Sequence, residues 1–146
     1  MLRVLIGGCF FLASCTDLSG FLEPAPPALL NTPLTVTVGG KQVAFDVGLT
    51  AHPGLDLSAL LRTTDNSIWP SAVSSGRVWV LHRNVAWVTN TTPDTRALPL
   101  AIGLKIVLAT GGPSWPAGDS ADVVMELRDG SGATQLVRAP RQVITR

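Results

Sequence analysis

From residue 34 onward, hydrophobic and polar residues alternate with a period of two, which is typical of strands that bury one face. Residues 34–38 (LTVTV) alternate in this way, and so do residues 42–49 (QVAFDVGL) after Gly39-Gly40-Lys41. A pair of glycines between two such runs favours a tight turn. We therefore predict a hairpin over residues 34–49 with one apolar face.

A second hairpin is predicted for residues 76–89, with a turn at Arg83-Asn84. The sequence leaves the length of its loop open. A two-residue loop would place Trp79 and Trp87 on opposite faces, whereas a three-residue loop would place them on the same face. The choice matters because a slip of one residue turns every side chain to the other face of a strand.

Further apolar runs follow, separated by turn residues. Residues 98–109 form a long run that predicts a central strand, and residues 122–128 and 133–138 predict another hairpin. A short edge strand is expected at 142–145. The stretch 51–75 is irregular, and its residues 57–62 fit either a helical turn or a short strand.

These runs amount to about seven short strands, with turn signals every eight to twelve residues. Such spacing favours an all-β fold, either an antiparallel sandwich or a small barrel. Residues 115–138 resemble the last hairpin of an immunoglobulin-like or fibronectin-like domain. The resemblance implies an antiparallel immunoglobulin-like sandwich over residues 34–146.

The charge and the cysteine content exclude some classes of function. Charged residues make up 14% of the chain and the formal net charge is +1, so we expect no nucleic-acid partner, which would require a concentrated cationic face. Both cysteines lie within the first fifteen residues. The body of the chain therefore has no thiolate that could bind a metal or act as a nucleophile.

The first residues have the features of an export signal. Arg3 precedes an apolar run over residues 4–13, which is too short to span a bilayer but suits the core of a signal peptide. The run ends in Leu12-Ala13-Ser14-Cys15. An ordinary signal peptide, or a buried first element of a cytosolic domain, is the alternative interpretation.

The ending Leu12-Ala13-Ser14-Cys15 resembles the lipobox of bacterial lipoproteins. The resemblance implies that residues 1–14 are a signal peptide, that cleavage falls between Ser14 and Cys15, and that the Cys15 thiol receives lipid. Two or more acyl chains anchor a protein stably. We therefore expect an extracytoplasmic protein of the cell envelope whose membrane partner is reached through Cys15. Thr16 at the next position favours the outer membrane in a two-membrane cell.

Residues 15–33 contain four prolines among small residues and predict a semi-extended spacer between the lipid and the domain. Alternatively, Phe21 and Leu22 pack on the domain.

Candidate catalytic groups are few. His52 and His82 have no partner at metal-ligand spacing, and we expect His82 to be a solvated turn residue. Ser114 lies in a proline-flanked loop rather than in a nucleophile elbow. We therefore predict no catalytic residues, no metal and no cofactor.

The four tryptophans are candidates for either core packing or binding. We favour the core for Trp79 and Trp87. Trp69 and Trp115 each precede a proline, and they fit the core or a contact with an envelope protein or glycan equally well.

Taken together, these features predict a membrane-anchored, non-catalytic binding or structural module of the cell envelope. Two alternatives remain. One is a small envelope hydrolase with an unrecognised site, and the other is an accessory lipoprotein of a secretion or envelope-assembly complex that pairs through a strand edge.

Overall fold

The computed structural model describes residues 20–94 and 103–146. The predicted Ser14–Cys15 cleavage and lipidation site lies outside these residues. The described part contains almost only strands, so the predicted all-β class is confirmed. The elements are β1 (Phe21–Pro24), η1 (Pro27–Asn31), β2 (Val36–Val38), β3 (Lys41–His52), β4 (Gly54–Thr63), β5 (Ser74–His82), β6 (Val85–Asn90), β7 (Thr92–Pro93), β8 (Leu104–Ala109), β9 (Ser120–Arg128), β10 (Thr134–Arg138) and β11 (Gln142–Thr145).

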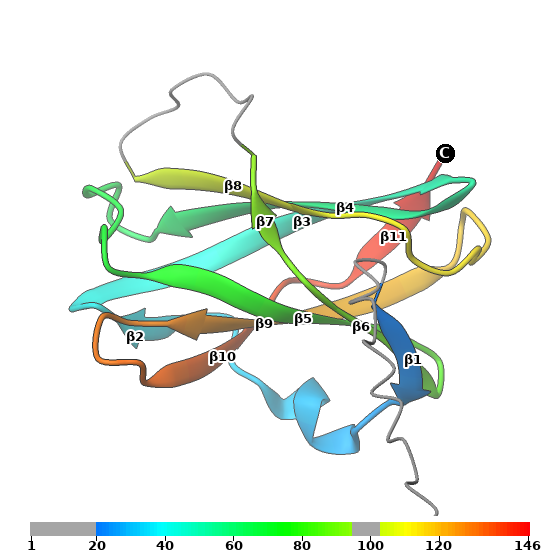
Figure 1. Cartoon of the computed structure of the whole chain (residues 1–146), viewed down its shortest axis with the longest axis horizontal. Coiled ribbons are helices and arrows are strands. Elements are labelled where there is room, and N and C mark those ends of the chain that lie inside the picture. Colours follow the sequence, from blue (N-terminus) through cyan, green and yellow to red (C-terminus); the bar gives the residue numbers. More distant parts are fainter. Residues whose placement is uncertain (1–19, 95–102) are drawn as a thin grey trace, which may run out of the picture.

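The strands form two layers that pack face to face (Figure 1). The β6 sheet has the order β1-β6-β5-β9-β10, and the β3 sheet has the order β3-β4-β8-β7 with β2 and β11 both beside β3. Among the described strands, only the pairing of β11 with β3 is parallel. The start of β11 also pairs with β9, so this short strand connects the two sheets.

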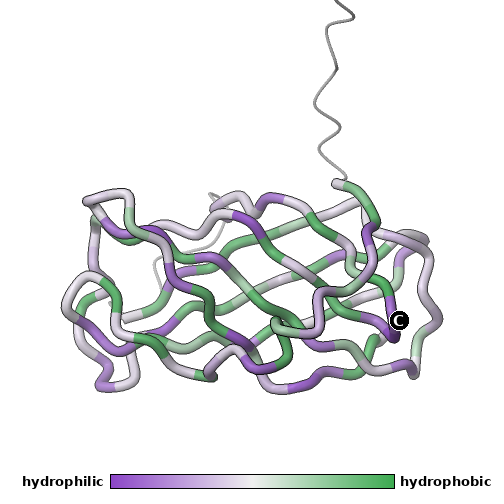
Figure 2. Tube along the Cα trace, turned by 90° about the horizontal axis from the view of Figure 1, so that it is seen from below, coloured by the Kyte–Doolittle hydropathy of each residue, from purple (hydrophilic) through white to green (hydrophobic). Residues whose placement is uncertain are grey.

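The core lies between the inner faces of the two sheets. Phe45, Leu61, Trp87 and Met125 are among its fully buried side chains. Hydrophobic and hydrophilic residues alternate along the strands, as Figure 2 shows, because successive side chains point to opposite faces. Burial of each large apolar side chain contributes about 1.5–3 kcal/mol, so this interior is the main source of stability.

The first predicted hairpin is confirmed. Val38 pairs with Lys41, which leaves Gly39 and Gly40 as a two-residue turn between β2 and β3. Their φ values are +58° and +76°, a left-handed conformation that glycine adopts without steric penalty. This turn type matches the right-handed twist of the strands, so the double glycine fixes the register.

The second hairpin has the two-residue loop. His82 pairs with Val85, and Arg83 takes a positive φ of 56° in the turn. Because Val80 is the partner of Trp87, whereas Trp79 is the partner of Val88, the two tryptophans lie on opposite faces. Trp87 points into the core between the sheets, and Trp79 packs on the outer face of the β6 sheet.

The irregular stretch of the sequence contains a regular ten-residue strand, β4. It pairs with β3 along its whole length, and the two strands meet at a tight turn where His52 is the partner of Gly54. The predicted central strand at 98–109 is described only from Gly103 onward. Its described part, β8, lies between β4 and the two-residue β7, second from the edge of the β3 sheet.

Residues 21–31 differ from the spacer that we expected, because they pack on the sandwich. β1 pairs with β6, where Phe21 is the partner of Val88. The short helix η1 buries Leu29 on the outer face of the β6 sheet, in a small cluster with Leu81 and Val124. The alternative in which Phe21 and Leu22 join the domain therefore fits the structure.

Because Trp87 and Trp79 lie on opposite faces of the β6 sheet, we expect their replacement by alanine to lower stability by different amounts. Trp87→Ala removes a fully buried ring between the sheets and should lower the free energy of unfolding by about 3–5 kcal/mol. Trp79→Ala, which removes a half-buried ring, should lower it by clearly less. Urea denaturation of both variants measures the difference, and equal losses would contradict the assignment of faces.

The turn between β9 and β10 predicts an acid-sensitive contribution to stability. Hydrogen bonds from the Ser131 hydroxyl and backbone amide hold the pKa of the Asp129 carboxyl below its ordinary value of 3.8. Because the folded pKa is lowered, this contribution is complete above pH 3.8 and is lost as the pH falls through the folded pKa. The stability difference between the wild type and Asp129→Asn should therefore shrink in acid, and a difference independent of pH would disprove the turn's role.

Candidate binding site

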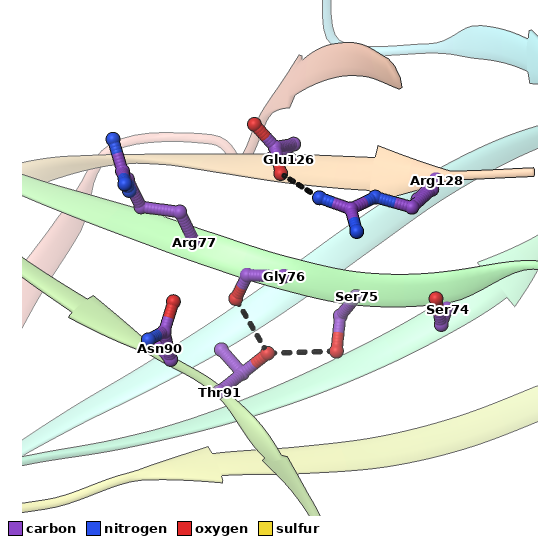
Figure 3. Close-up of a pocket in the computed structure, with 8 residues that line it drawn as sticks. All are labelled: Ser74, Ser75, Gly76, Arg77, Asn90, Thr91, Glu126 and Arg128. Atoms are coloured by element: carbon purple, nitrogen blue, oxygen red, sulfur yellow. Dashed lines mark hydrogen bonds and ion pairs between the residues drawn. The ribbon is translucent and has the colours of Figure 1, made fainter. Parts of the chain in front are cut away.

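A bulge in β5 opens a polar pocket at the end of the β6 sheet. The pairing of β5 with β9 shifts between Ser75 and Val78. Such a shift bends the strand locally and turns side chains out of the regular pleat. The polar pocket has a volume of about 440 Å³ and is drawn in Figure 3; its lining residues are Ser74, Ser75, Gly76, Arg77, Asn90, Thr91, Glu126 and Arg128.

One wall of the polar pocket is fixed by Thr91, which follows β6. Its hydroxyl lies 2.7 Å from Ser75 Oγ and 3.0 Å from the Gly76 carbonyl oxygen (Figure 3). Its backbone N–H also donates to the Gly76 carbonyl, at 3.0 Å. These bonds join the bulged part of β5 to the segment that crosses from one sheet to the other, so the wall is rigid.

The opposite wall carries charge. Glu126 and Arg128 are two residues apart on β9, so they share a face, and Arg128 Nη2 lies 3.5 Å from Glu126 Oε1. A Cβ at Gly76 would come within 3.0 Å of the same carboxylate oxygen, so a glycine leaves room for the Glu126 side chain. A larger residue at position 76 would therefore require the Glu126 carboxylate to shift.

Arg77 supplies a second cation at the mouth of the polar pocket. Its guanidinium carbon lies 5.8 Å from the centre of the Trp79 ring, within the range of a cation–π interaction. Trp79 thereby limits the positions of this exposed side chain.

An edge groove adjoins the polar pocket and shares Arg77 and Asn90 with it. It lies where β1 and β6 of one sheet face β7 and β8 of the other, and its volume is about 610 Å³. Its remaining lining residues are Gly20, Phe21, Val88, Thr89, Thr92, Leu108, Ala109 and Thr110. The two hollows together offer charged and hydroxyl groups beside apolar surface, which is the composition of a binding site for a small organic ligand.

His82 is buried, contrary to the expected solvated turn residue. Its Nε2 lies 2.8 Å from Asp119 Oδ2, and the Trp115 ring stacks on the imidazole with the ring centres 4.6 Å apart. Asp119 also lies 3.6 Å from Arg83 Nη2. This His82 cluster lies where β11 joins the sheets, because the Asp119 carbonyl accepts a hydrogen bond from the Ile144 N–H.

The His82 cluster and the polar pocket are separate. His82 ends β5, whereas the pocket residues begin it, and the five steps from Arg77 to His82 correspond to about 17 Å of extended strand. Neither the pocket nor the groove is lined by His82 or Asp119. The histidine–acid pair therefore does not face the ligand-sized hollows.

The other candidates lie apart from both hollows. Trp69 is buried in the core, and its indole N–H donates to the Val73 carbonyl at 3.2 Å. Trp115 is half-buried against the core, and Ser114 and His52 are exposed. The structure thus gives Trp69 and Trp115 packing contacts and does not bring them together into a surface.

Two further observations bear on the class of site. In the described ranges 20–94 and 103–146, histidine, cysteine and acidic side chains form no group of three that could hold a metal ion. Within the same ranges, no helix has the length and apolar character needed to cross a bilayer.

Comparison with known proteins adds no assignment. No protein-family model matches the chain, and no curated protein and no solved structure matches it either. The functional argument therefore rests on the amino-acid sequence and on the geometry of the described residues.

Little in the amino-acid sequence indicates the polar pocket. Ser74-Ser75-Gly76 at the start of a predicted strand is consistent with a bulge, because glycine inside a strand favours one. Nothing nearby in the sequence indicated that Glu126 and Arg128 lie opposite these residues, or that Asp119 reaches His82.

The His82 cluster predicts a graded response to substitution at Asp119. Asp119→Ala leaves the buried imidazole nitrogen without its acceptor and should lower the free energy of unfolding by about 1–3 kcal/mol. Asp119→Asn retains an acceptor oxygen and should lose less. Thermal or urea unfolding measures both, and wild-type stability of Asp119→Ala would show that the bond contributes nothing.

Proposed function

We propose that this chain is a bacterial lipoprotein, anchored through Cys15 on the extracytoplasmic side of the cell envelope, whose β-sandwich is a non-catalytic binding or structural module. The observation that carries the proposal is the apolar leader that ends in Leu12-Ala13-Ser14-Cys15. The outer membrane is the preferred location in a two-membrane cell, because Thr16 rather than an acidic residue follows the cysteine.

The sandwich supports a binding role through its polar pocket. The pocket places two guanidinium groups, a carboxylate, an amide and three hydroxyls around one small volume. Groups of these types donate to and accept from hydroxyl-bearing molecules. The pocket chemistry is therefore suited to an envelope glycan, with the edge groove available to an apolar part of the same ligand.

The hydrolase alternative has less support. Its natural general base would be His82, held by Asp119. A base must lie within hydrogen-bond reach of the reacting group, and His82 is 8% exposed with the Trp115 ring stacked on it. The packing of His82 and Asp119 at the junction of the two sheets explains their contact without a catalytic role.

An exposed last strand would favour the assembly alternative, in which a partner pairs with a strand edge. β11 instead pairs with β3 on one side and with β9 at its start, so it is not available for strand addition along its full length.

The anchoring is tested with the two cysteines, which provide their own control. The wild type and Cys9→Ala should be recovered in the detergent phase of a Triton X-114 partition, with an intact mass that shows cleavage before Cys15 and added acyl chains. Cys15→Ala should lose the acyl mass. A native protein with Met1 still attached, or with an unmodified Cys15 thiol, would overturn the proposal.

A further inference from the structure

The chain is fixed to the sandwich from Gly20 onward. Gly20 has a φ of +78°, and a Cβ at this position would overlap the Val88 carbonyl oxygen, so the backbone lies directly against β6. The next four residues pair with β6 as β1. The Ala25 N–H then donates to the Asn84 carbonyl at 2.9 Å, which fixes the far end of this segment.

This attachment shortens the distance between the sandwich and the membrane. Only five peptide units separate Cys15 from Gly20, and a fully extended chain of that length spans at most about 18 Å. If Cys15 carries lipid, as proposed above, its acyl chains lie in the bilayer and the start of β1 lies at or just above the headgroup layer. The sandwich is therefore held against the membrane with one defined end toward it.

The end nearest to Cys15 exposes apolar side chains. Phe21 is 54% exposed and Leu22 is 55% exposed, although they are consecutive residues of a strand and so point to opposite faces. Both are accessible because β1 is the outermost strand of the β6 sheet in the described part of the chain. Leu30 on η1, the next element along the chain, is 51% exposed.

Two charged side chains of opposite sign lie at this end of the described structure. Glu23 is half-buried on β1, and Arg77 is exposed in the edge groove beside Phe21. An acid and a base in this arrangement produce no strong field of one sign, so contact with lipid would depend on the apolar side chains. Burial of apolar side chains at the boundary of headgroups and acyl chains is favourable.

We propose that Phe21 and Leu22 form a membrane-contact surface, which inserts into the interface of the bilayer that holds the Cys15 lipid. This inference rests on the proposed lipidation and adds the orientation of the sandwich: β1 and the mouth of the edge groove face the lipid. The loop between β4 and β5 lies at the other end of the long axis (Figure 1) and faces away.

The cysteine-free body makes the contact measurable. After the proposed processing, Cys9 has been removed with the leader and the Cys15 thiol carries lipid. A cysteine introduced by Leu22→Cys or Phe21→Cys is then the one free thiol of the mature protein. Each variant is labelled with a nitroxide and reconstituted into phosphatidylethanolamine–phosphatidylglycerol vesicles. The matched control is Ile68→Cys, since Ile68 is a 66% exposed apolar residue in the loop between β4 and β5.

Power-saturation spectra compare the accessibility of each label to oxygen, which concentrates in lipid, with that to a water-soluble nickel complex. We expect labels at 21 and 22 to gain oxygen accessibility and lose nickel accessibility on reconstitution, while the label at 68 keeps the high nickel accessibility of a residue in water.

High nickel accessibility at all three positions, in protein that floats with the vesicles, would overturn the membrane contact but not the lipidation. Protein that does not float would overturn the lipidation as well. Shielding of position 22 from both reagents, with spin–spin broadening, would show a second copy on β1 and overturn the lipid contact.

Discussion

The burial of one face of each sheet against the other is the interaction on which the rest of the structure depends. The inner residues of β3, β4, β5, β6 and β9 alternate with outer ones, so a shift of one position in any of these strands would turn its core side chains away from the opposite sheet. This constraint fixes the register of the long strands. The register in turn places the bulge of β5 opposite Glu126, and it places Trp79 on the outer face beneath Arg77.

Much of this fold was predictable because its strongest signals are local. The alternation around Gly39-Gly40 and around Arg83-Asn84 encodes both strands and turn within about twenty residues, and both hairpins form as predicted. The segments that the sequence assigned poorly depend on distant partners. β1 lies in the proline-containing segment 15–33 and becomes a strand because β6 offers it an edge. β4 has a regular alternation that the His52-Pro53-Gly54 turn obscured.

The candidate site was less predictable than the fold for the same physical reason. The polar pocket combines the start of β5 and its bulge with Asn90 at the end of β6, with Thr91 and with the end of β9. Its groups therefore come from segments about fifty positions apart. The pair of His82 and Asp119 spans 37 positions. A single sequence shows which of these residues are polar, but it does not show which of them meet.

The position of β11 has a consequence for the order of folding. Gln142 pairs with Ala121 of β9, so β11 joins the two sheets. On the other side, Ile144 pairs with Leu49 of β3, and the Thr145 hydroxyl donates to the Leu49 carbonyl at 3.1 Å, a contact across 96 positions of the chain. Contacts between such distant segments form slowly, because a large loop must close before they are gained. The pairing of β11 with both sheets therefore forms only after residues 142–145 have been synthesised. For a chain that is exported, as we propose, this delay favours an extended state during passage through a translocation channel.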